Sequence, residues 1–125
     1  MIVLDSSVVL ATFLDEPGGE KFLNIVGEYA ISSVNLGEVA TKLTEVGYAD
    51  VAVLSATEPI LENCHVLTAR QGVVAGLLRR KTRQFGLSMG DRCCLALALD
   101  LGAEVWTADR AWAGLDLGVK VRVIR

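Results

Sequence analysis

Short apolar runs alternate with helical patterns along this chain, and the alternation limits the folds it can adopt. Apolar runs without a polar face are typical of strands that are covered on both sides. Strands joined through helices form right-handed crossovers in a parallel sheet. The order of elements therefore predicts an α/β fold, a three-layer α/β/α sandwich with helices on both faces of the sheet. The expected strands are residues 2–4, 29–32, 64–67, 104–108 and 119–124.

Helical patterns fill the segments between these runs, and capping residues mark several of their ends. Pro17 suits the start of a second helix that reaches Val26, and Ser33 and Thr68 are good N-cap residues. The helix after Thr68 has an apolar face of Val73, Val74, Leu77 and Leu78. The expected helices are residues 6–14, 17–26, 33–47, 48–54, 69–85 and 91–101, with a short helix from Asp109.

The length of 125 residues corresponds to one domain, residues 1–125, with a single core. Hydrophobic residues make up 52% of the chain, but no apolar run reaches the roughly 18 residues of a membrane span. The first residues lack the basic region and cleavage site of a signal peptide. We therefore expect a cytoplasmic protein with no membrane association. Its surplus apolar surface suits self-association or a partner.

The three cysteines, Cys64, Cys93 and Cys94, do not form a disulfide framework, because their number is odd and two are adjacent. We expect them to be reduced and buried. The chain has no CxxC spacing, which argues against a zinc site. The only histidine, His65, falls in an expected buried strand, so a core position is favoured over catalysis. Trp106 and Trp112 are likewise expected to pack rather than to stack on bases.

Charge is distributed unevenly along the chain. Residues 1–66 carry two lysines against ten acids, whereas residues 67–125 carry ten basic residues against five acids. The net charge of -3 argues against indiscriminate nucleic-acid binding. A basic face formed by the second half remains compatible with this composition.

Three acids occupy positions from which they can meet at one edge of the sheet. Asp5 follows the first expected strand, Asp109 follows the fourth, and Asp91 lies in the first turn of a helix. Ligands of open α/β sheets bind at the carboxyl ends of the strands. Carboxylates gathered there repel one another unless a cation neutralises them, and oxygen ligands suit Mg²⁺ or Mn²⁺.

Each acid also fits an ordinary structural role. Asp5 and Asp109 are suitable caps for the helices that follow them. Asp91 fits a capping box with Ser88. Glu38 falls opposite the apolar stripe of its helix, where a solvated pair with Lys42 is the simpler interpretation.

With Asp5, Glu38, Asp91 and Asp109 in place, the chain resembles PIN-domain ribonucleases, specifically the VapC-type toxins of bacterial or archaeal toxin–antitoxin pairs. The resemblance runs nearly end to end. It is carried by IVLDSSVVLA, SSVNLGEVATKL, GLSMGDRCCLALAL, VWTADRAW and VKVRVIR, in that order.

The resemblance implies a five-stranded parallel sheet in the order 3-2-1-4-5. It also implies that Asp5, Asp91 and Asp109 bind Mg²⁺ or Mn²⁺, directly or through water. Glu38 becomes the fourth acid of the pocket, against the solvated pair with Lys42. The small hydroxyl residues that line or orient the site match Ser6 and Thr107.

Some family members carry a further acid just after the position of Asp109, whereas Arg110, Ala111 and Trp112 follow it here. One-metal and two-metal mechanisms therefore both stay open. The candidate RNA-binding residues are Arg92 and Arg110, which follow site acids, and Arg79, Arg80, Lys81 and Arg83 at a helix end. A solvated helix face explains the last four equally well.

By this resemblance the expected function is that of an Mg²⁺-dependent endoribonuclease toxin that hydrolyses RNA. Its expected partners are a VapB-type antitoxin and a second copy of the chain. Two alternatives remain: an inactive PIN-like module that binds RNA or protein, and a receiver-like phosphoacceptor domain. The sequence argues against the receiver, because no aspartate follows the third expected strand.

Overall fold

The computed structural model of this protein describes residues 1–25 and 28–125. Within these residues, five strands form one parallel sheet in the order β3-β2-β1-β4-β5. This confirms the α/β fold and the strand order 3-2-1-4-5. The strands are β1 (Ile2–Leu4), β2 (Tyr29–Ser32), β3 (Cys64–His65), β4 (Glu104–Thr107) and β5 (Val121–Val123).

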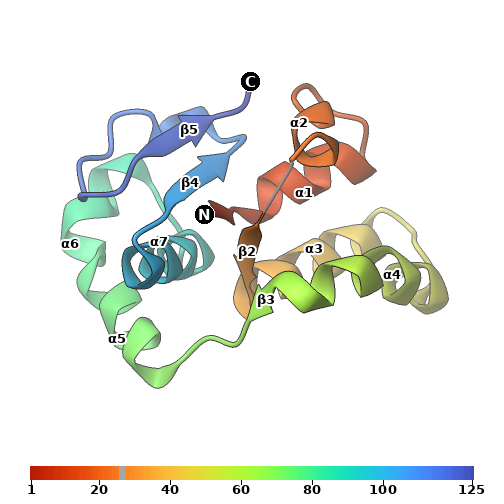
Figure 1. Ribbon diagram of the computed structural model, residues 1–125, viewed down its shortest axis with the longest axis horizontal. Coiled ribbons are helices and arrows are strands. Elements are labelled where there is room, and N and C mark those ends of the chain that lie inside the picture. Colours follow the sequence, from red (N-terminus) through yellow and green to blue (C-terminus); the bar gives the residue numbers. More distant parts are fainter. Residues whose placement is uncertain (26–27) are drawn as a thin grey trace.

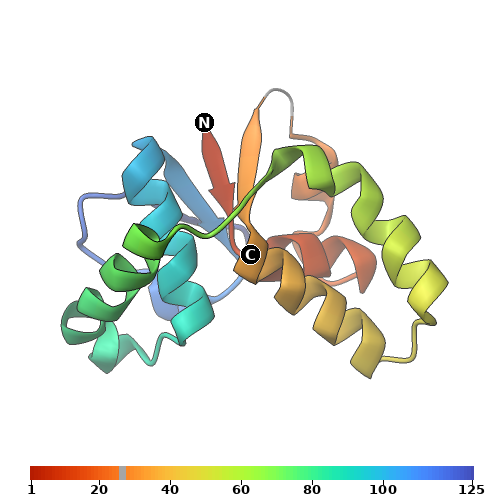
Figure 2. The same ribbon diagram turned by 90° about the horizontal axis from the view of Figure 1, so that it is seen from below.

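Helices cover the sheet on both faces, as the three-layer expectation requires (Figures 1 and 2). The helices on one side are α1 (Ser6–Phe13), α2 (Glu20–Leu23), α3 (Ser33–Glu45) and α4 (Asp50–Thr57). The helices on the other side are α5 (Ala69–Leu77), α6 (Arg79–Thr82) and α7 (Met89–Leu101). Short 3₁₀ helices are η1 (Glu58–Asn63), η2 (Arg83–Phe85) and η3 (Arg110–Trp112).

Two apolar layers hold the sandwich together, one on each face of the sheet. Successive strand residues point to opposite faces, so Leu4 packs in the layer that contains Val39 of α3. Val3 packs in the layer that contains Leu95 of α7. All four side chains are essentially inaccessible to solvent. The central strands are therefore buried on both sides, as their unbroken apolar sequences indicate.

The pairing of β1 with β4 sets the position of the acidic residues. Leu4 is opposite Trp106 in the register, and the Asp5 amide donates to the Trp106 carbonyl at 3.0 Å. Asp5 directly follows β1, and Thr107 is the last residue of β4. The two residues therefore lie side by side at the carboxyl ends of these strands.

The strand order excludes the receiver-like alternative. Doubly wound domains of that type have the order 2-1-3-4-5, with the third strand inside the sheet. Here β3 is an edge strand and pairs only with β2 among the described residues.

The expected helix at residues 17–26 is wrong at its start. Residues 17–19 form a turn, and α2 begins at Glu20. Gly18 has a φ of +88°, and a Cβ at Gly19 would lie 2.5 Å from the Ala11 carbonyl oxygen. The turn therefore closes tightly onto α1, which a helix starting at Pro17 would prevent. Val26, the expected end of that helix, lies outside the described residues.

The β2–α3 junction also differs from expectation in detail. Ser32 is the N-cap of α3, with its hydroxyl accepting from the Val34 amide, whereas Ser33 is the first helical residue. The Ser33 hydroxyl accepts from the Leu67 amide instead. Leu67 lies outside β3, which is shorter than the expected strand at 64–67. The expected burial of His65 is wrong, because this short edge strand leaves its side chain exposed.

The long helix expected at 69–85 is broken at Leu78. The Leu78 carbonyl accepts from the Thr82 hydroxyl and from two backbone amides, a pattern that bends helices. Thr68 caps the first part through a capping box, as expected. The predicted apolar face is only partly correct, because Val73 and Leu77 are exposed. The residues that α5 buries are Gln71 and Ala75.

The remaining expectations on packing are mostly confirmed. Trp106 and Trp112 are buried, and Cys93 and Cys94 are buried free thiols. Cys64 is also free but only half-buried. None of the helices in the described residues combines the length and the apolar character needed to cross a bilayer.

Candidate active site

Asp5 is the most deeply placed acid of the sheet edge. Its side chain is 3% exposed, and its backbone occupies the N-cap position of α1. The carboxylate makes no capping bond to the helix. Oδ2 accepts from the hydroxyl groups of Ser7 at 2.5 Å and Thr107 at 3.0 Å. Oδ1 is buried and has no hydrogen-bond partner among the described residues. Helix capping therefore does not explain this residue.

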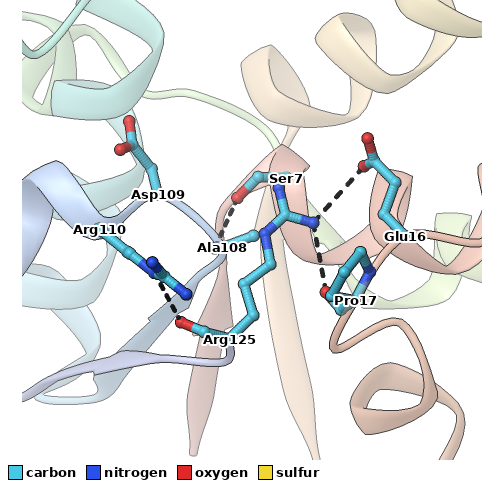
Figure 3. A pocket seen from close by; sticks show the side chains of 7 residues that line it. All are labelled: Ser7, Glu16, Pro17, Ala108, Asp109, Arg110 and Arg125. Carbon is cyan, nitrogen blue, oxygen red and sulfur yellow. Dashed lines mark hydrogen bonds and ion pairs between the residues drawn. The ribbon is translucent and has the colours of Figure 1, made fainter.

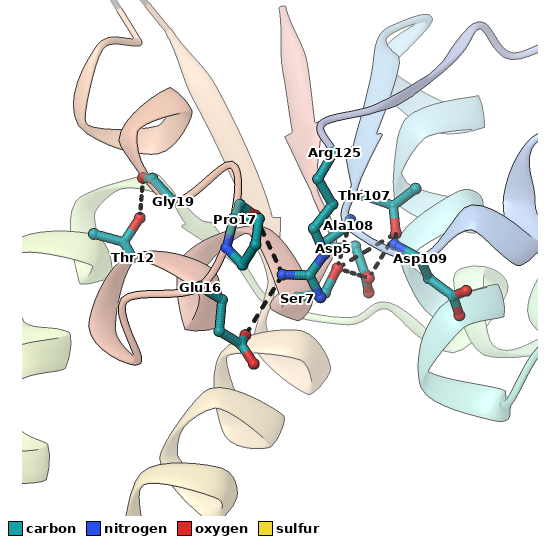
Figure 4. A network of polar contacts seen from close by, with 10 residues as sticks. All are labelled: Asp5, Ser7, Thr12, Glu16, Pro17, Gly19, Thr107, Ala108, Asp109 and Arg125. Carbon is teal, nitrogen blue, oxygen red and sulfur yellow. Dashed lines mark hydrogen bonds and ion pairs between the residues drawn. The ribbon is translucent and has the colours of Figure 1, made fainter.

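The hydroxyl groups around Asp5 are held by the backbone after β4 (Figure 4). The Ala108 amide donates to Ser7 Oγ at 2.9 Å, and the Asp109 amide donates to Thr107 Oγ1 at 3.1 Å. Thr107 thus lies where the sequence predicted a site hydroxyl. For the other predicted hydroxyl, Ser6, it is the next residue, Ser7, that contacts the carboxylate.

Glu38 reaches the same edge from α3. Its Oε1 accepts from Asn35 Nδ2 at 2.8 Å, and that amide also donates to the Gly90 carbonyl at 3.0 Å. A Cβ on Gly90 would overlap Glu38 Oε2, so the carboxylate rests directly on the first turn of α7. In the described part of the chain, Glu38 forms no ion pair with Lys42. The helical-wheel interpretation is wrong.

Asp91 combines its structural role with a position at the site. Its Oδ2 accepts from the Ser88 amide at 2.9 Å, and its own amide donates to Ser88 Oγ at 3.2 Å. This is the capping box predicted as the ordinary explanation. The box uses one carboxylate oxygen and leaves Oδ1 for another partner.

Asp109 is exposed and caps η3. Its Oδ1 accepts from the Ala111 amide at 2.9 Å. The capping alternative is therefore also confirmed for this residue. Its backbone is fixed beside Thr107, whereas its side chain is open to solvent.

The electrostatic environment of Asp5 is unfavourable to its charged form. Burial raises the pKa of Asp5 to about 6, because desolvation penalises the carboxylate. The hydrogen bonds from Ser7 and Thr107 lower this pKa, but the charges of Asp91 and Glu38 raise it.

The pKa of Asp91 is raised as well, again mainly by burial. Asp109 adds to this shift, while the hydrogen bonds from Ser88 and the charge of Arg92 oppose it. Asp91 therefore interacts electrostatically with both Asp5 and Asp109. Charge interactions therefore link Glu38 and Asp91 to Asp5, and Asp109 to Asp91.

The side chains do not form a finished coordination shell. Among the described residues, no three histidine, cysteine, aspartate or glutamate side chains are arranged to hold one metal ion. Two observations nevertheless fit a divalent cation. Asp5 Oδ1 is buried without a partner in the described part of the chain, and the donors are all carboxylate oxygens, which suit Mg²⁺ or Mn²⁺. Without a cation the carboxylates repel one another. They would therefore have to move closer together for one metal ion to contact them all.

Comparison with known proteins identifies the family. The sequence matches the family described as PIN domain over residues 2–116. This chain belongs to the PIN domain family. No curated protein is similar enough in sequence to match this PIN domain.

Several solved structures with the same fold are toxins or toxin–antitoxin complexes. A chain of a toxin–antitoxin complex from Klebsiella pneumoniae is 17% identical, with a TM-score of 0.78 over 100% of this chain and 98% of that one. VapC20 from Mycobacterium tuberculosis, described as a toxin that cleaves the sarcin–ricin loop, is 18% identical, with a TM-score of 0.75 over 96% and 99%. A chain of the VapBC2 complex from Rickettsia felis is 18% identical, with a TM-score of 0.73 over 100% of both. At these identities the likeness establishes the shared fold.

The predicted basic residues of this PIN domain have different surroundings. Arg92 is half-buried, and its guanidinium donates to the carbonyls of Ala75 at 3.0 Å and Ser88 at 3.3 Å. It therefore joins α5 to the start of α7. The four predicted basic residues in and next to α6 are exposed and lie at a separate hollow. Arg79, Arg80 and Arg83 line the hollow, and Lys81 is exposed nearby.

Arg110 borders a cavity of about 600 Å³ next to the acids. Ser7 and Asp109 line the side towards the acidic site, and Glu16 and Arg125 line the opposite part. Figure 3 shows the Arg125 side chain extending between Ser7 and Glu16. The carboxyl edge therefore carries positive groups immediately beside the carboxylates.

Sequence reasoning missed Ser7, Asn35, Gly90 and Arg125. Asn35 had a detectable signal, since it is a polar residue one helical turn before the buried Val39. The other three depend on contacts between distant segments, for which the sequence pattern has no comparable signal.

Proposed function

We propose that this PIN domain is a divalent-metal-dependent endoribonuclease and the toxin of a toxin–antitoxin pair. The observation that supports it most strongly is the buried Asp5 carboxylate. One of its oxygens is oriented by two hydroxyl groups, and the other has no partner among the described residues. Leaving a carboxylate oxygen buried without a partner is costly unless a cation or proton binds it. The likeness to structures from toxin–antitoxin complexes also supports the proposal.

In this proposal Asp5, Glu38, Asp91 and Asp109 hold Mg²⁺, directly or through water, and Mn²⁺ can replace it. When bound, the cation supplies Lewis acidity that favours ionisation of water and offsets charge developing on a phosphate. The reaction is hydrolysis of a phosphodiester bond of RNA, and the expected products carry a 5′-phosphate and a 3′-hydroxyl.

The protein groups act by orienting the carboxylates. Thr107 and Ser7 fix one oxygen of Asp5, and the other has no partner among the described residues. Asn35 holds Glu38 against α7. The Ser88 capping box fixes one oxygen of Asp91. Such supporting hydrogen bonds hold ligating groups in place and tune their basicity.

Metal-free cleavage through the 2′-hydroxyl is a poor fit to this chain. That chemistry uses a paired general acid and base, for which histidine is the most frequent choice. The single histidine, His65, is exposed on β3.

The proposed partners are RNA as substrate, a VapB-type antitoxin and a second copy of this chain. Exposed apolar side chains on α4 and α5 offer surface for protein partners: Val51, Leu54, Val73 and Leu77. We also propose that the protein acts in the cytoplasm.

The test is incubation of the purified chain with structured RNA in Mg²⁺, in Mn²⁺ and in EDTA. We expect cleavage only with the metals, with 5′-phosphate ends on the products. Asp5→Asn protein purified in parallel controls for contaminating nuclease. Cleavage that survives EDTA, or that is unchanged by Asp5→Asn, would contradict the proposed mechanism.

A further inference from the structure

We propose that the cavity beside Asp109 is a phosphate subsite for the RNA strand, with Arg110 and Arg125 as its cationic groups. Without RNA, Arg125 forms an ion pair with the Glu16 carboxylate. A bound phosphate would replace that carboxylate. The assignment rests on the proposed function, because it concerns a phosphate next to the one that is cleaved.

The position of the cavity is the first argument. Its wall includes Asp109, one of the four acids, and Ser7, whose hydroxyl holds Asp5. An RNA strand whose scissile phosphate lies at the acids must place a neighbouring nucleotide close by. The cavity of about 600 Å³ has room for a phosphate group and part of its nucleotide.

The geometry of Arg125 is the second argument. Its Nη1 donates to the Pro17 carbonyl at 3.2 Å and lies 3.8 Å from Glu16 Oε1 (Figures 3 and 4). Interactions within the described residues use only this nitrogen of its guanidinium. The remaining N–H groups of the planar fork are suited to a phosphate.

The loop that carries Pro17 is itself fixed. The Thr12 hydroxyl donates to the Gly19 carbonyl at 2.6 Å, and a Cβ on Gly18 would lie 3.0 Å from Ile124. This packing places the Pro17 carbonyl where it orients Arg125. The guanidinium is therefore positioned before any ligand arrives, which reduces the entropy lost on binding.

The link between Arg125 and Glu16 is weak enough to be exchanged. Their separation is long, and the two side chains are 30% and 43% exposed. Ion pairs of this kind are screened by water and contribute little. A phosphodiester can replace the carboxylate, because both present oxygen acceptors with negative charge.

Arg110 adds a second positive group at the same cavity. Its Nε donates to the Arg125 backbone oxygen at 3.3 Å. Figure 3 shows its side chain directed towards the backbone of Arg125. Once a cation neutralises Asp109, the two arginines would outnumber Glu16 among the charged residues that line the cavity.

An ion pair of the same length at the other end of β4 and β5 provides the control. Lys120 Nζ lies 3.8 Å from Glu104 Oε2, the same separation as in the Arg125–Glu16 pair. Lys120 and Glu104 lie at the amino ends of the strands, away from the acids. Lys120→Gln and Glu104→Gln therefore change the charge as Arg125→Gln and Glu16→Gln do, at a distant place.

The experiment measures binding of a fluorescein-labelled 12-nucleotide uridine RNA by anisotropy over a range of salt concentrations. All variants carry Asp91→Asn to prevent cleavage, and Mg²⁺ is present in large excess so that the metal site weakened by this substitution stays occupied. Losing one phosphate contact makes the negative slope of log affinity against log salt shallower by about 0.7. This corresponds to about fivefold weaker binding at 0.1 M salt. We expect that loss for Arg125→Gln, a gain of about two- to fivefold for Glu16→Gln, and changes below about twofold for the control pair.

The outcomes separate this proposal from the proposed function. If wild-type protein cleaves RNA but Arg125→Gln behaves like Lys120→Gln, the subsite is wrong and the nuclease stands. If wild type neither cleaves nor binds RNA, both proposals fail. If Arg125→Gln leaves RNA binding intact but weakens capture of the co-expressed antitoxin, the cavity belongs to the protein partner and the subsite is overturned.

Discussion

The inner and open sides of the acidic site differ in how much freedom the fold leaves to their charged groups. We call the surroundings of Asp5 and Glu38 the inner side, where buried or half-buried hydroxyl and amide groups fix both carboxylates. The open side is the cavity between Asp109 and Arg125, where the charged groups are exposed and their ion pair is long. The difference suggests a division of labour. The inner side is unfavourable without a cation, and the open side can exchange its partners.

The largest expected effect comes from comparing the acids that represent the two sides. Asp5→Asn and Asp109→Asn should each reduce cleavage about 10³-fold or more, because each removes a proposed metal ligand worth several kcal/mol. Only Asp5→Asn should also raise the metal-free stability at pH 7.5, by roughly 1 to 3 kcal/mol, since it removes a buried charge. Asp109→Asn should change stability by no more than about 0.5 kcal/mol.

Urea unfolding in EDTA measures the stabilities, and single-turnover RNA cleavage in Mg²⁺ measures the activities. In Asp5→Asn the oxygen of the new side-chain amide can still accept from Ser7 and Thr107, so the fold should be retained. Equal stability changes in the two variants would remove the distinction between the sides.

The pH dependence of stability follows from the raised pKa of Asp5. The folded protein holds a proton on Asp5 up to a pKa of about 6, whereas the unfolded chain releases it near 3.8. Stability of the metal-free protein should therefore fall as the pH rises from about 4 to 6, by up to about 3 kcal/mol from this group. The raised pKa of Asp91 acts in the same direction.

The informative quantity is the free energy of unfolding of Asp5→Asn minus that of wild type, since other carboxylates contribute to both profiles. Urea midpoints at half-unit pH intervals in EDTA give that difference. It should grow between pH 4 and 6 and stay constant above. A difference that shrinks with rising pH would mean that Asp5 is stabilised, rather than penalised, in its charged form.

A smaller and more local effect is expected at Gly90. Gly90→Ala places a methyl group where the Glu38 carboxylate lies, so the carboxylate must move away. We expect cleavage to fall about 10- to 100-fold, the usual cost of disturbing groups around a metal site. Stability should change by less than about 1 kcal/mol, because the displaced atoms end a flexible side chain and alanine favours the helix.

Gly72→Ala is the matched control, since a Cβ there meets no atom of the described residues within 4 Å. It should leave cleavage unchanged within about twofold. Full activity of Gly90→Ala would show that the position of Glu38 against α7 does not matter for the reaction.

The sequence was most informative where position along a strand determined the outcome. Asp5 and Asp109 were predicted to meet because each follows a strand of a parallel sheet, and β1 and β4 are indeed neighbours. The pattern could not choose between Ser6 and Ser7, because successive residues at a helix start point about 100° apart and the sequence does not show which hydroxyl group faces the sheet edge.

Helical periodicity was less informative about the site. It reports which face of a helix is buried, but not what lies against the border of that face. Glu38 is at such a border, three residues after the buried Asn35, and contacts with α7 decide its role. The same limit explains Val73 and Leu77, which are exposed because α5 packs through other residues.

The open side was largely beyond sequence reasoning. Arg110 was proposed because it follows a site acid, but Arg125 is brought beside it only by the path of β5 and the turn at Pro17. His65 shows the converse case, since an apolar strand pattern predicted burial and the short edge strand left it exposed.

The most direct test of the central claim, that the four acids jointly bind a divalent cation, is calorimetric titration with Mn²⁺ at pH 7.5. We predict saturable binding to wild type, weakened about tenfold or more by Asp5→Asn and by Asp91→Asn. Asp116→Asn, which changes an exposed acid outside the site, should leave binding unchanged. No Mn²⁺ binding by wild type, or binding that survives both site substitutions, would contradict the account.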